Sequence, residues 1–113
     1  MIDFDNRPWG RWEEYLYEPT YRVKRLVIFP GKRISLQLHQ QRREIWVVVA
    51  GSGLMTLEDD QFDVKTGDVI KIEREQPHRI ANTGEVPLVI IETQQGICPE
   101  EDITRIEDDF GRA

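Results

Sequence analysis

The sequence predicts an all-β fold, a small antiparallel sandwich or barrel. Short runs of β-branched and aromatic residues alternate with Gly, Pro, Asn and Asp turn signals, at spacings of about 8–12 residues. Helical periodicity is hard to find before the last dozen residues. Because no helical segments alternate with the strands, a doubly wound α/β fold is not expected.

The expected strands follow the apolar runs in order. They are residues 23–29, 34–38, 45–50, 54–57, 69–72, 78–81 and 88–92. Glycines such as Gly31 and Gly51 stand between them, where a turn needs a backbone conformation that other residues avoid. We expect one domain over residues 1–113, with an N-terminal strap over about 1–20. The acidic tail, about 99–113, is expected to form a helical turn or a second strap.

Length and composition exclude several classes of protein. A chain of 113 residues has the size of a single domain, and its net charge of −6 disfavours nucleic-acid binding. No apolar run approaches the roughly 20 residues that span a bilayer, and no signal peptide is visible. The only cysteine, Cys98, excludes an internal disulfide and a cysteine-based zinc site. We therefore expect a cytoplasmic protein without nucleic acid or membrane as a partner.

Alternation along the expected strands brings polar side chains to one interior. In residues 34–39, Gln37 and His39 point one way while the apolar residues point the other way. Glu44 and His78 begin the corresponding faces of two later strands. Two imidazoles, a carboxylate and an amide oxygen together suit a divalent ion: Zn²⁺, Mn²⁺, Co²⁺, Fe²⁺ or Ni²⁺. We predict that these four residues converge as metal ligands.

The spacing of these residues resembles the two cupin motifs, and therefore implies a cupin-type barrel. The matching positions are Gly31, Gln37, His39, Glu44, Gly51, Gly67, His78 and Asn82. Gln37 replaces the first histidine of the motif, and Glu73 and Glu75 replace its usual Pro and Gly. Because the only two histidines both fall on ligand positions, the metal interpretation is preferred over ordinary core or surface histidines. For Gln37, metal binding and a core hydrogen bond stay equally open, while Glu44 is preferred as a ligand over a solvated turn carboxylate.

The resemblance narrows to the C-terminal cupin domain of type II mannose-6-phosphate isomerases, usually fused behind a mannose-1-phosphate guanylyltransferase. The landmarks run through the chain in one order: Arg7-Pro8-Trp9-Gly10, Pro30-Gly31, Ser35-Leu36-Gln37, Arg42 with Glu44 and Trp46, Pro77-His78-Arg79, Glu101-Asp102-Ile103, Arg105 and Gly111-Arg112. One departure matters, because the family commonly has a histidine where this sequence has Ile45.

This resemblance implies an enzyme that interconverts mannose 6-phosphate and fructose 6-phosphate by proton transfer through an enediolate, with a metal ion stabilising the oxyanion. No glycine-rich phosphate loop is present, so guanylyl transfer by this chain is not expected. Two alternatives stay open. One is a non-catalytic metal-binding cupin module that binds a sugar or nucleotide sugar, or assists a separate nucleotidyltransferase. The other is an iron-dependent dioxygenase, which the isomerase-like landmarks disfavour.

Further roles follow from the resemblance and from side-chain chemistry. Arg42 is the first choice for recognising the sugar phosphate, and Arg79 the second, since guanidinium groups match phosphate oxygens. Trp46 is expected to line the pocket. The catalytic base is not assigned, and Glu73 and Glu75 are the only candidates named.

Two further expectations concern Ile45 and the assembly. Alternation points residue 45 away from Glu44, so the missing histidine is not necessarily catalytic. A homodimer is expected because small barrels have exposed edge strands, with the N-terminal strap through Trp9 and Trp12 contributing to the contact.

Overall fold

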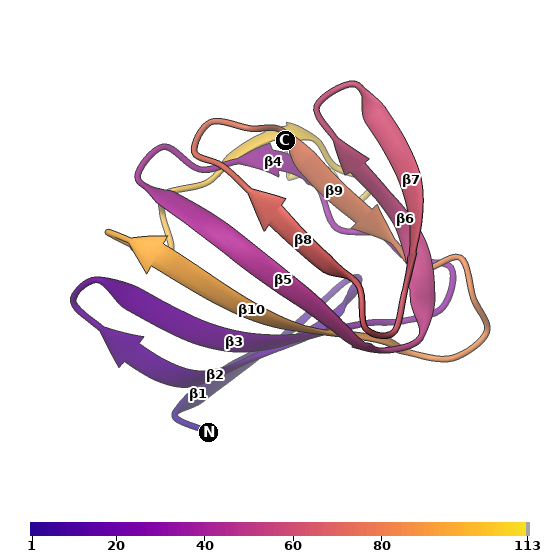
Figure 1. The fold of residues 1–113 in the computed structure, drawn as a ribbon, viewed down its shortest axis with the longest axis horizontal. Helices are drawn as coiled ribbons and strands as arrows, with labels where there is room; N and C mark the ends of the chain where they lie inside the picture. The colour runs from indigo at the N-terminus through magenta and orange to yellow at the C-terminus, as the bar shows by residue number, and fades with distance from the viewer. Residues whose placement is uncertain (113) are drawn as a thin grey trace.

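Two antiparallel β-sheets face each other in the computed structural model, which describes residues 1–112 (Figure 1). The strands are β1 Asp3–Arg7, β2 Gly10–Glu18, β3 Tyr21–Ile28, β4 Leu36–Leu38, β5 Arg42–Ala50, β6 Ser52–Leu57, β7 Asp60–Lys65, β8 Val69–Ile72, β9 His78–Ala81, β10 Leu88–Gly96 and β11 Thr104–Glu107. One sheet has the order β1-β2-β3-β10-β5-β8 and the other β11-β4-β9-β6-β7. The all-β antiparallel architecture is confirmed. Among residues 1–112, no helix has the length and apolar character needed to cross a membrane.

The strands predicted from apolar runs all form, and β8 and β9 have the predicted bounds. β5 begins earlier than predicted, at Arg42, and β10 continues to Gly96. The extensions pair with each other: Glu92 is the register partner of Trp46, and Gln94 that of Glu44. Because the added residues are mainly polar, a prediction based on apolar runs does not include them in the strands.

The segment expected as an N-terminal strap is a β-hairpin that belongs to the sheet. β1 pairs with β2, and β2 pairs with β3, so the hairpin extends the six-stranded sheet (Figure 1). Gly10 opens β2 at a position where a Cβ atom would collide with the Val27 carbonyl. Charged residues interrupt the apolar residues of β1 and β2, so these two strands were not predicted from apolar runs.

The acidic tail, expected as a helical turn or a strap, contains a strand that packs along the five-stranded sheet. β11 pairs with β4, with Arg105 opposite Gln37. Arg79 holds this strand, because its guanidinium donates hydrogen bonds to the carbonyl oxygens of Ile34 (2.9 Å) and Glu107 (3.2 Å). The tail therefore closes one edge of the five-stranded sheet and reaches the interior.

The space between the sheets changes from apolar to polar along β5 and β10. Leu88 and Ile90 of β10 are buried, and the next residues on the same face, Glu92 and Gln94, are also buried. Antiparallel β5 shows the same change in reverse, from apolar Val48 to the charged residues at its start. One end of the interior is thus a packed core and the other end is a polar site.

Candidate metal centre

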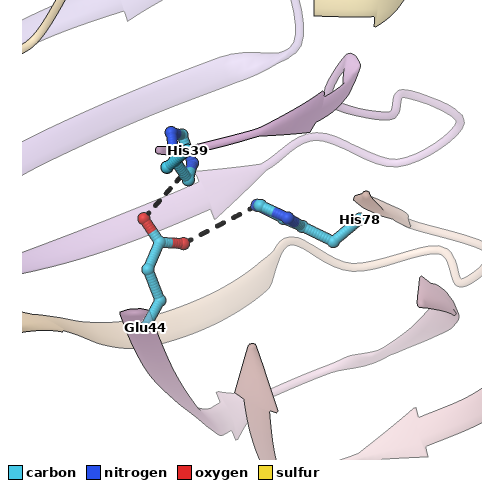
Figure 2. A group of neighbouring side chains, drawn as sticks. All are labelled: His39, Glu44 and His78. Atoms are coloured by element: carbon cyan, nitrogen blue, oxygen red, sulfur yellow. Dashed lines mark ion pairs between the residues drawn. The ribbon is translucent and has the colours of Figure 1, made fainter. Parts of the chain in front are cut away.

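His39, Glu44 and His78 meet at the polar end of the interior (Figure 2). His39 follows β4 and His78 begins β9, both in the five-stranded sheet, whereas Glu44 lies on β5 of the other sheet. Their ligand atoms lie within 4.8 Å of one another. The Nε2 atoms of His39 and His78 are 3.4 Å and 3.7 Å from the Glu44 carboxylate oxygens. The structure therefore brings together three of the four residues predicted as ligands.

Backbone carbonyls orient both imidazole rings. The Nδ1 atom of His39 lies 2.7 Å from the carbonyl oxygen of Asp102, and that of His78 lies 2.9 Å from the carbonyl oxygen of Gln76. Since a carbonyl only accepts, each Nδ1 carries a proton, and Nε2 is the ring nitrogen that faces Glu44. Burial, together with the positive charge of Arg42, lowers the pKa of His39 to about 4. His39 is therefore neutral near pH 7, as a metal ligand must be.

The Nε2 atom of His78 has no hydrogen-bond partner within residues 1–112, although the side chain is completely buried. A buried nitrogen left unpaired costs about 1–3 kcal/mol. A metal ion between the imidazoles and the carboxylate would satisfy it. Two neutral imidazoles and one carboxylate form a donor set that fits a divalent first-row ion.

Glu44 is fixed by two donors from its own strand. The Trp46 indole N–H donates to Oε1 at 3.1 Å, and Arg42 Nε donates to Oε2 at 2.8 Å. A second nitrogen of Arg42 lies 3.2 Å from Nε2 of His39. Trp46 and Arg42 also line a cavity next to the cluster, and their polar groups contact Glu44 directly. Both side chains therefore orient the cluster.

Gln37, the fourth predicted ligand, lies beside the cluster. It is the register partner of His78 and lines the cavity. Its side-chain oxygen accepts a hydrogen bond of 2.7 Å from the Ser35 hydroxyl. Coordination of a metal through that oxygen would require this bond to be exchanged.

Three predicted candidates are not brought to the cavity. Arg79 follows inward-pointing His78 in β9 and so takes the opposite face, where it holds the tail strand. Glu73 and Glu75 are exposed, and Glu73 pairs with Arg43 at 3.1 Å. The substrate role predicted for Arg79 and the acid–base role considered for the two glutamates are therefore not supported by their positions.

Ile45 lies between two inward-facing residues, Glu44 and Trp46, and is itself only partly buried on the other face of β5. A histidine at this position would point away from the cluster. The expectation that residue 45 points away from Glu44 therefore agrees with the structure.

A cavity of about 90 Å³ adjoins the cluster. Its lining combines tryptophans, cations, amides and two carboxylates: Trp9, Trp12, Trp46, Arg7, Lys24, Arg42, Arg105, Arg112, Gln37, Gln94, Glu92 and Glu100, with Leu26, Ile34 and Ile103. Trp9 and Trp12 are buried within the protomer, which removes them from any exposed dimer surface. Cationic side chains outnumber carboxylates in this lining, so the cavity favours an anionic ligand.

Glu92 is a site residue that the sequence analysis missed. Its side chain is buried, lines the cavity and accepts a hydrogen bond of 2.6 Å from Gln94. Burial and the nearby negative charge of Glu44 raise the pKa of Glu92 above its ordinary value. The sequence contains a pattern that could have identified Glu92: in the alternation Leu88, Ile90, Glu92, a carboxylate shares a strand face with two apolar residues.

Comparisons with known proteins agree with this fold. The family model described as mannose-6-phosphate isomerase C-terminal matches residues 4–108. The alginate biosynthesis protein AlgA of Pseudomonas aeruginosa is 40% identical over 107 residues, which cover 94% of this chain and 22% of that protein. A mannose-1-phosphate guanylyltransferase of Klebsiella pneumoniae is 37% identical, with 94% and 23% covered. The chain thus spans less than a quarter of these relatives.

A solved structure supports the fold independently. A conserved Klebsiella pneumoniae protein with a double-stranded β-helix domain superimposes with a TM-score of 0.75 at 19% identity. The superposition covers 84% of this chain and 82% of that one. The cupin-type double-stranded β-helix expected from the motif spacing is confirmed.

Proposed function

We propose, on the premise that this chain belongs to the mannose-6-phosphate isomerase C-terminal family, that the domain binds a mannose-class sugar phosphate at a divalent metal centre and assists a mannose-1-phosphate guanylyltransferase. The observation that carries this proposal is the His39–Glu44–His78 cluster beside a cationic, tryptophan-lined cavity. The names of the similar proteins support a place in mannose-based polysaccharide biosynthesis.

The metal ion would be held by Nε2 of His39, Nε2 of His78 and the carboxylate of Glu44. When bound, it supplies a positive charge that polarises a sugar oxygen. Trp46 and Arg42 keep the carboxylate oriented toward the two imidazoles through their hydrogen bonds.

The cavity offers complementary groups for a sugar. Tryptophan rings such as Trp12 provide apolar faces for the ring of a hexose. The side-chain oxygen of Gln94 is buried and has no hydrogen-bond partner within residues 1–112, and it lines the same cavity. A sugar hydroxyl would satisfy this acceptor, which otherwise costs free energy.

Isomerisation of mannose 6-phosphate to fructose 6-phosphate is the second candidate function, and Glu92 favours it. A carboxylate with a raised pKa can take the proton from the carbon beside the carbonyl and return it to the neighbouring carbon. The electron pair of the broken C–H bond forms the enediolate double bond while the carbonyl pair moves to its oxygen. The proton of the neighbouring hydroxyl passes to that oxygen as the former carbonyl carbon is protonated, so the step balances without an external oxidant. Glu92 lies in the cavity, in contrast to Glu73 and Glu75.

The test is to reconstitute the protein with each divalent ion and to measure two properties. Calorimetry with mannose 6-phosphate, mannose 1-phosphate and GDP-mannose should detect metal-dependent binding of at least one of them. Absence of binding with every ion would contradict the proposal. A coupled assay of fructose 6-phosphate formation, with Glu92→Gln alongside the wild type, separates the candidates. Turnover that Glu92→Gln abolishes supports the isomerase, and binding without turnover supports the assisting role.

The assisting role has a direct test of its own. Added domain should increase the rate at which a guanylyltransferase lacking its own C-terminal cupin domain forms GDP-mannose. An unchanged rate at saturating domain would contradict this part of the proposal.

The homodimer remains a proposal, as does the cytoplasmic location. β1 is an edge strand of the six-stranded sheet, and Ile2 and Phe4 near it are exposed, which supports pairing with a second copy. Light scattering at tens of micromolar protein should give a dimer mass, and a monomer mass near 13 kDa would contradict it.

A further inference from the structure

We propose that Arg105, with Arg7 and Arg112, forms the anchor for the phosphate group of the ligand, at the end of the cavity away from the metal cluster. This inference rests on the proposed function for the identity of the sugar, but the phosphate site itself stands on the geometry of these three arginines. It moves phosphate recognition away from Arg42 and Arg79, the residues predicted for it from the sequence.

Strand register places Arg105 on the same interior face as the cluster. Arg105 of β11 is opposite Gln37 of β4, and Gln37 is opposite His78 of β9. Directly opposed residues of antiparallel strands point to the same face of the sheet. With neighbouring strands about 4.8 Å apart, the backbones of Arg105 and His78 are separated by about 10 Å, with Gln37 between them.

The guanidinium of Arg105 has no direct partner in the protein. Its Nε atom is buried without a hydrogen-bond partner, and Arg105 forms no ion pair with any carboxylate in residues 1–112. Burial and the positive charges of Arg112 and Arg7 lower the pKa of this guanidinium, and the nearby carboxylate of Asp108, which is held by Arg112, offsets only part of this effect. Like charges gathered around a buried donor indicate a position where an anion belongs.

The other cations of the cavity are already paired. Arg42 donates to Glu44, and Lys24 forms an ion pair with Glu100. Arg112 is held against Asp108 through Nε at 2.7 Å and Nη2 at 3.1 Å, which fixes its guanidinium at the cavity rim. Arg105 is therefore the cation of this lining that gains most from a phosphate, since a guanidinium can donate two parallel hydrogen bonds to phosphate oxygens.

The two ends of the cavity define how a ligand lies in it. With phosphate at Arg105, the opposite end of the sugar approaches the side chains that contact the metal cluster. A hexose with phosphate on its terminal carbon would place its carbonyl carbon and adjacent hydroxyl at that end.

The test compares Arg105→Gln and Arg105→Lys with the wild type, and uses Arg43→Gln as a control that removes the same charge outside the cavity. Calorimetry with inorganic phosphate and with mannose 6-phosphate measures affinity in the metal-loaded full chain. Arg105→Gln should weaken both by about tenfold or more, as expected for loss of charge-assisted hydrogen bonds. Arg43→Gln should change neither by more than about twofold, and metal affinity should be unchanged in all variants.

Each outcome decides between the phosphate anchor and the broader function. Wild-type protein that binds mannose 6-phosphate with an affinity unaffected by Arg105→Gln would overturn the anchor and leave the proposed function standing. Arg105-dependent binding of inorganic phosphate, without binding of any sugar phosphate, would support the anchor and contradict the proposed function. If Arg105→Gln does not fold, Arg105→Lys decides, because it retains the charge and loses the planar donor pair. Phosphate binding by Arg105→Lys equal to that of the wild type would overturn the proposal.

Discussion

The two ends of the cavity differ in how their buried charges are satisfied. At the metal end, Glu44 accepts hydrogen bonds from Arg42 and Trp46, and the neighbouring histidine rings are fixed by backbone carbonyls. At the other end, Arg105 has a buried nitrogen without a partner and no ion pair among the described residues. Glu44 is thus held by two donors before any ligand arrives, while Nε2 of His78 at the same end and Nε of Arg105 at the other end have no hydrogen-bond partner within residues 1–112. A polar interior does not by itself identify a binding site. Buried polar atoms that lack a hydrogen-bond partner show more specifically where a ligand would bind.

The two ends also come from different parts of the chain. The metal end is carried by β5, β9 and the residue that follows β4. The cationic end is carried by the terminal segments: Arg7 ends β1, Arg105 lies on β11 and Arg112 follows it. The segments that the sequence analysis treated as straps therefore contribute to ligand binding in this account.

The largest effect is expected from His78→Ala. Loss of a direct nitrogen ligand should weaken binding of Zn²⁺ or Co²⁺ by more than about 100-fold, beyond the range typical of outer-shell partners. Calorimetry of metal binding measures this, and far-UV circular dichroism checks that the strands persist. Stoichiometric metal binding at wild-type affinity would show that the cluster is not the metal site.

A smaller loss at the same end is expected from Trp46→Phe. This change removes the indole N–H that donates to Glu44 at 3.1 Å and retains an aromatic ring. Metal affinity should fall by about tenfold, as for other hydrogen-bond donors to a metal ligand. Unchanged affinity in this variant would mean that Glu44 does not depend on Trp46 for its orientation.

Arg79→Gln should affect the phosphate end of the cavity and leave the metal end unchanged. Removing a buried guanidinium that holds β11 should lower the free energy of unfolding by about 1–3 kcal/mol. Because β11 carries Arg105, affinity for inorganic phosphate should fall by several-fold while metal affinity stays near the wild-type value. Chemical denaturation and calorimetry measure the two quantities. An equal loss of metal affinity would contradict the independence of the two ends.

The smallest effect, a change in pH dependence, is expected from Glu92→Gln in metal-free protein. In the unfolded chain Glu92 loses its proton near its ordinary pKa of 4.5, whereas the folded protein retains that proton to higher pH. The folded state therefore binds more protons, and wild-type stability contributed by Glu92 is lost as pH rises from 4.5 through the raised pKa.

Glutamine at residue 92 does not titrate, so the stability of Glu92→Gln relative to wild type should increase with pH over that interval. Urea unfolding at several pH values measures the difference, with Glu73→Gln as an exposed control. A difference that is constant with pH would contradict the raised pKa of Glu92.

Much of the metal end was predictable because it depends on local alternation. The bounds of β8 and β9 matched the apolar runs, and alternation placed Gln37, Glu44 and His78 on interior faces. The resemblance to cupin motifs then identified which of these residues to bring together. What alternation could not provide was the hydrogen bond that commits Gln37 to Ser35.

The cationic end was not predictable from local patterns. β11 is four residues long and pairs with β4, a strand far away in the sequence. The inward position of Arg105 follows from that long-range pairing, which no periodicity in the acidic tail encodes. Arg79 was predicted at the substrate because its neighbour His78 points inward, whereas in the structure its guanidinium contacts the tail strand.

The central claim is that one cavity joins a metal centre to a phosphate anchor, and anomalous diffraction tests it most directly. A crystal of the Mn²⁺-loaded protein with mannose 6-phosphate should show the manganese peak at about 2–2.2 Å from His39 Nε2, His78 Nε2 and a Glu44 oxygen. The same map should show the phosphate within hydrogen-bond distance of Arg105. A metal peak away from these three side chains, or a phosphate bound at Arg42 or Arg79, would contradict the account.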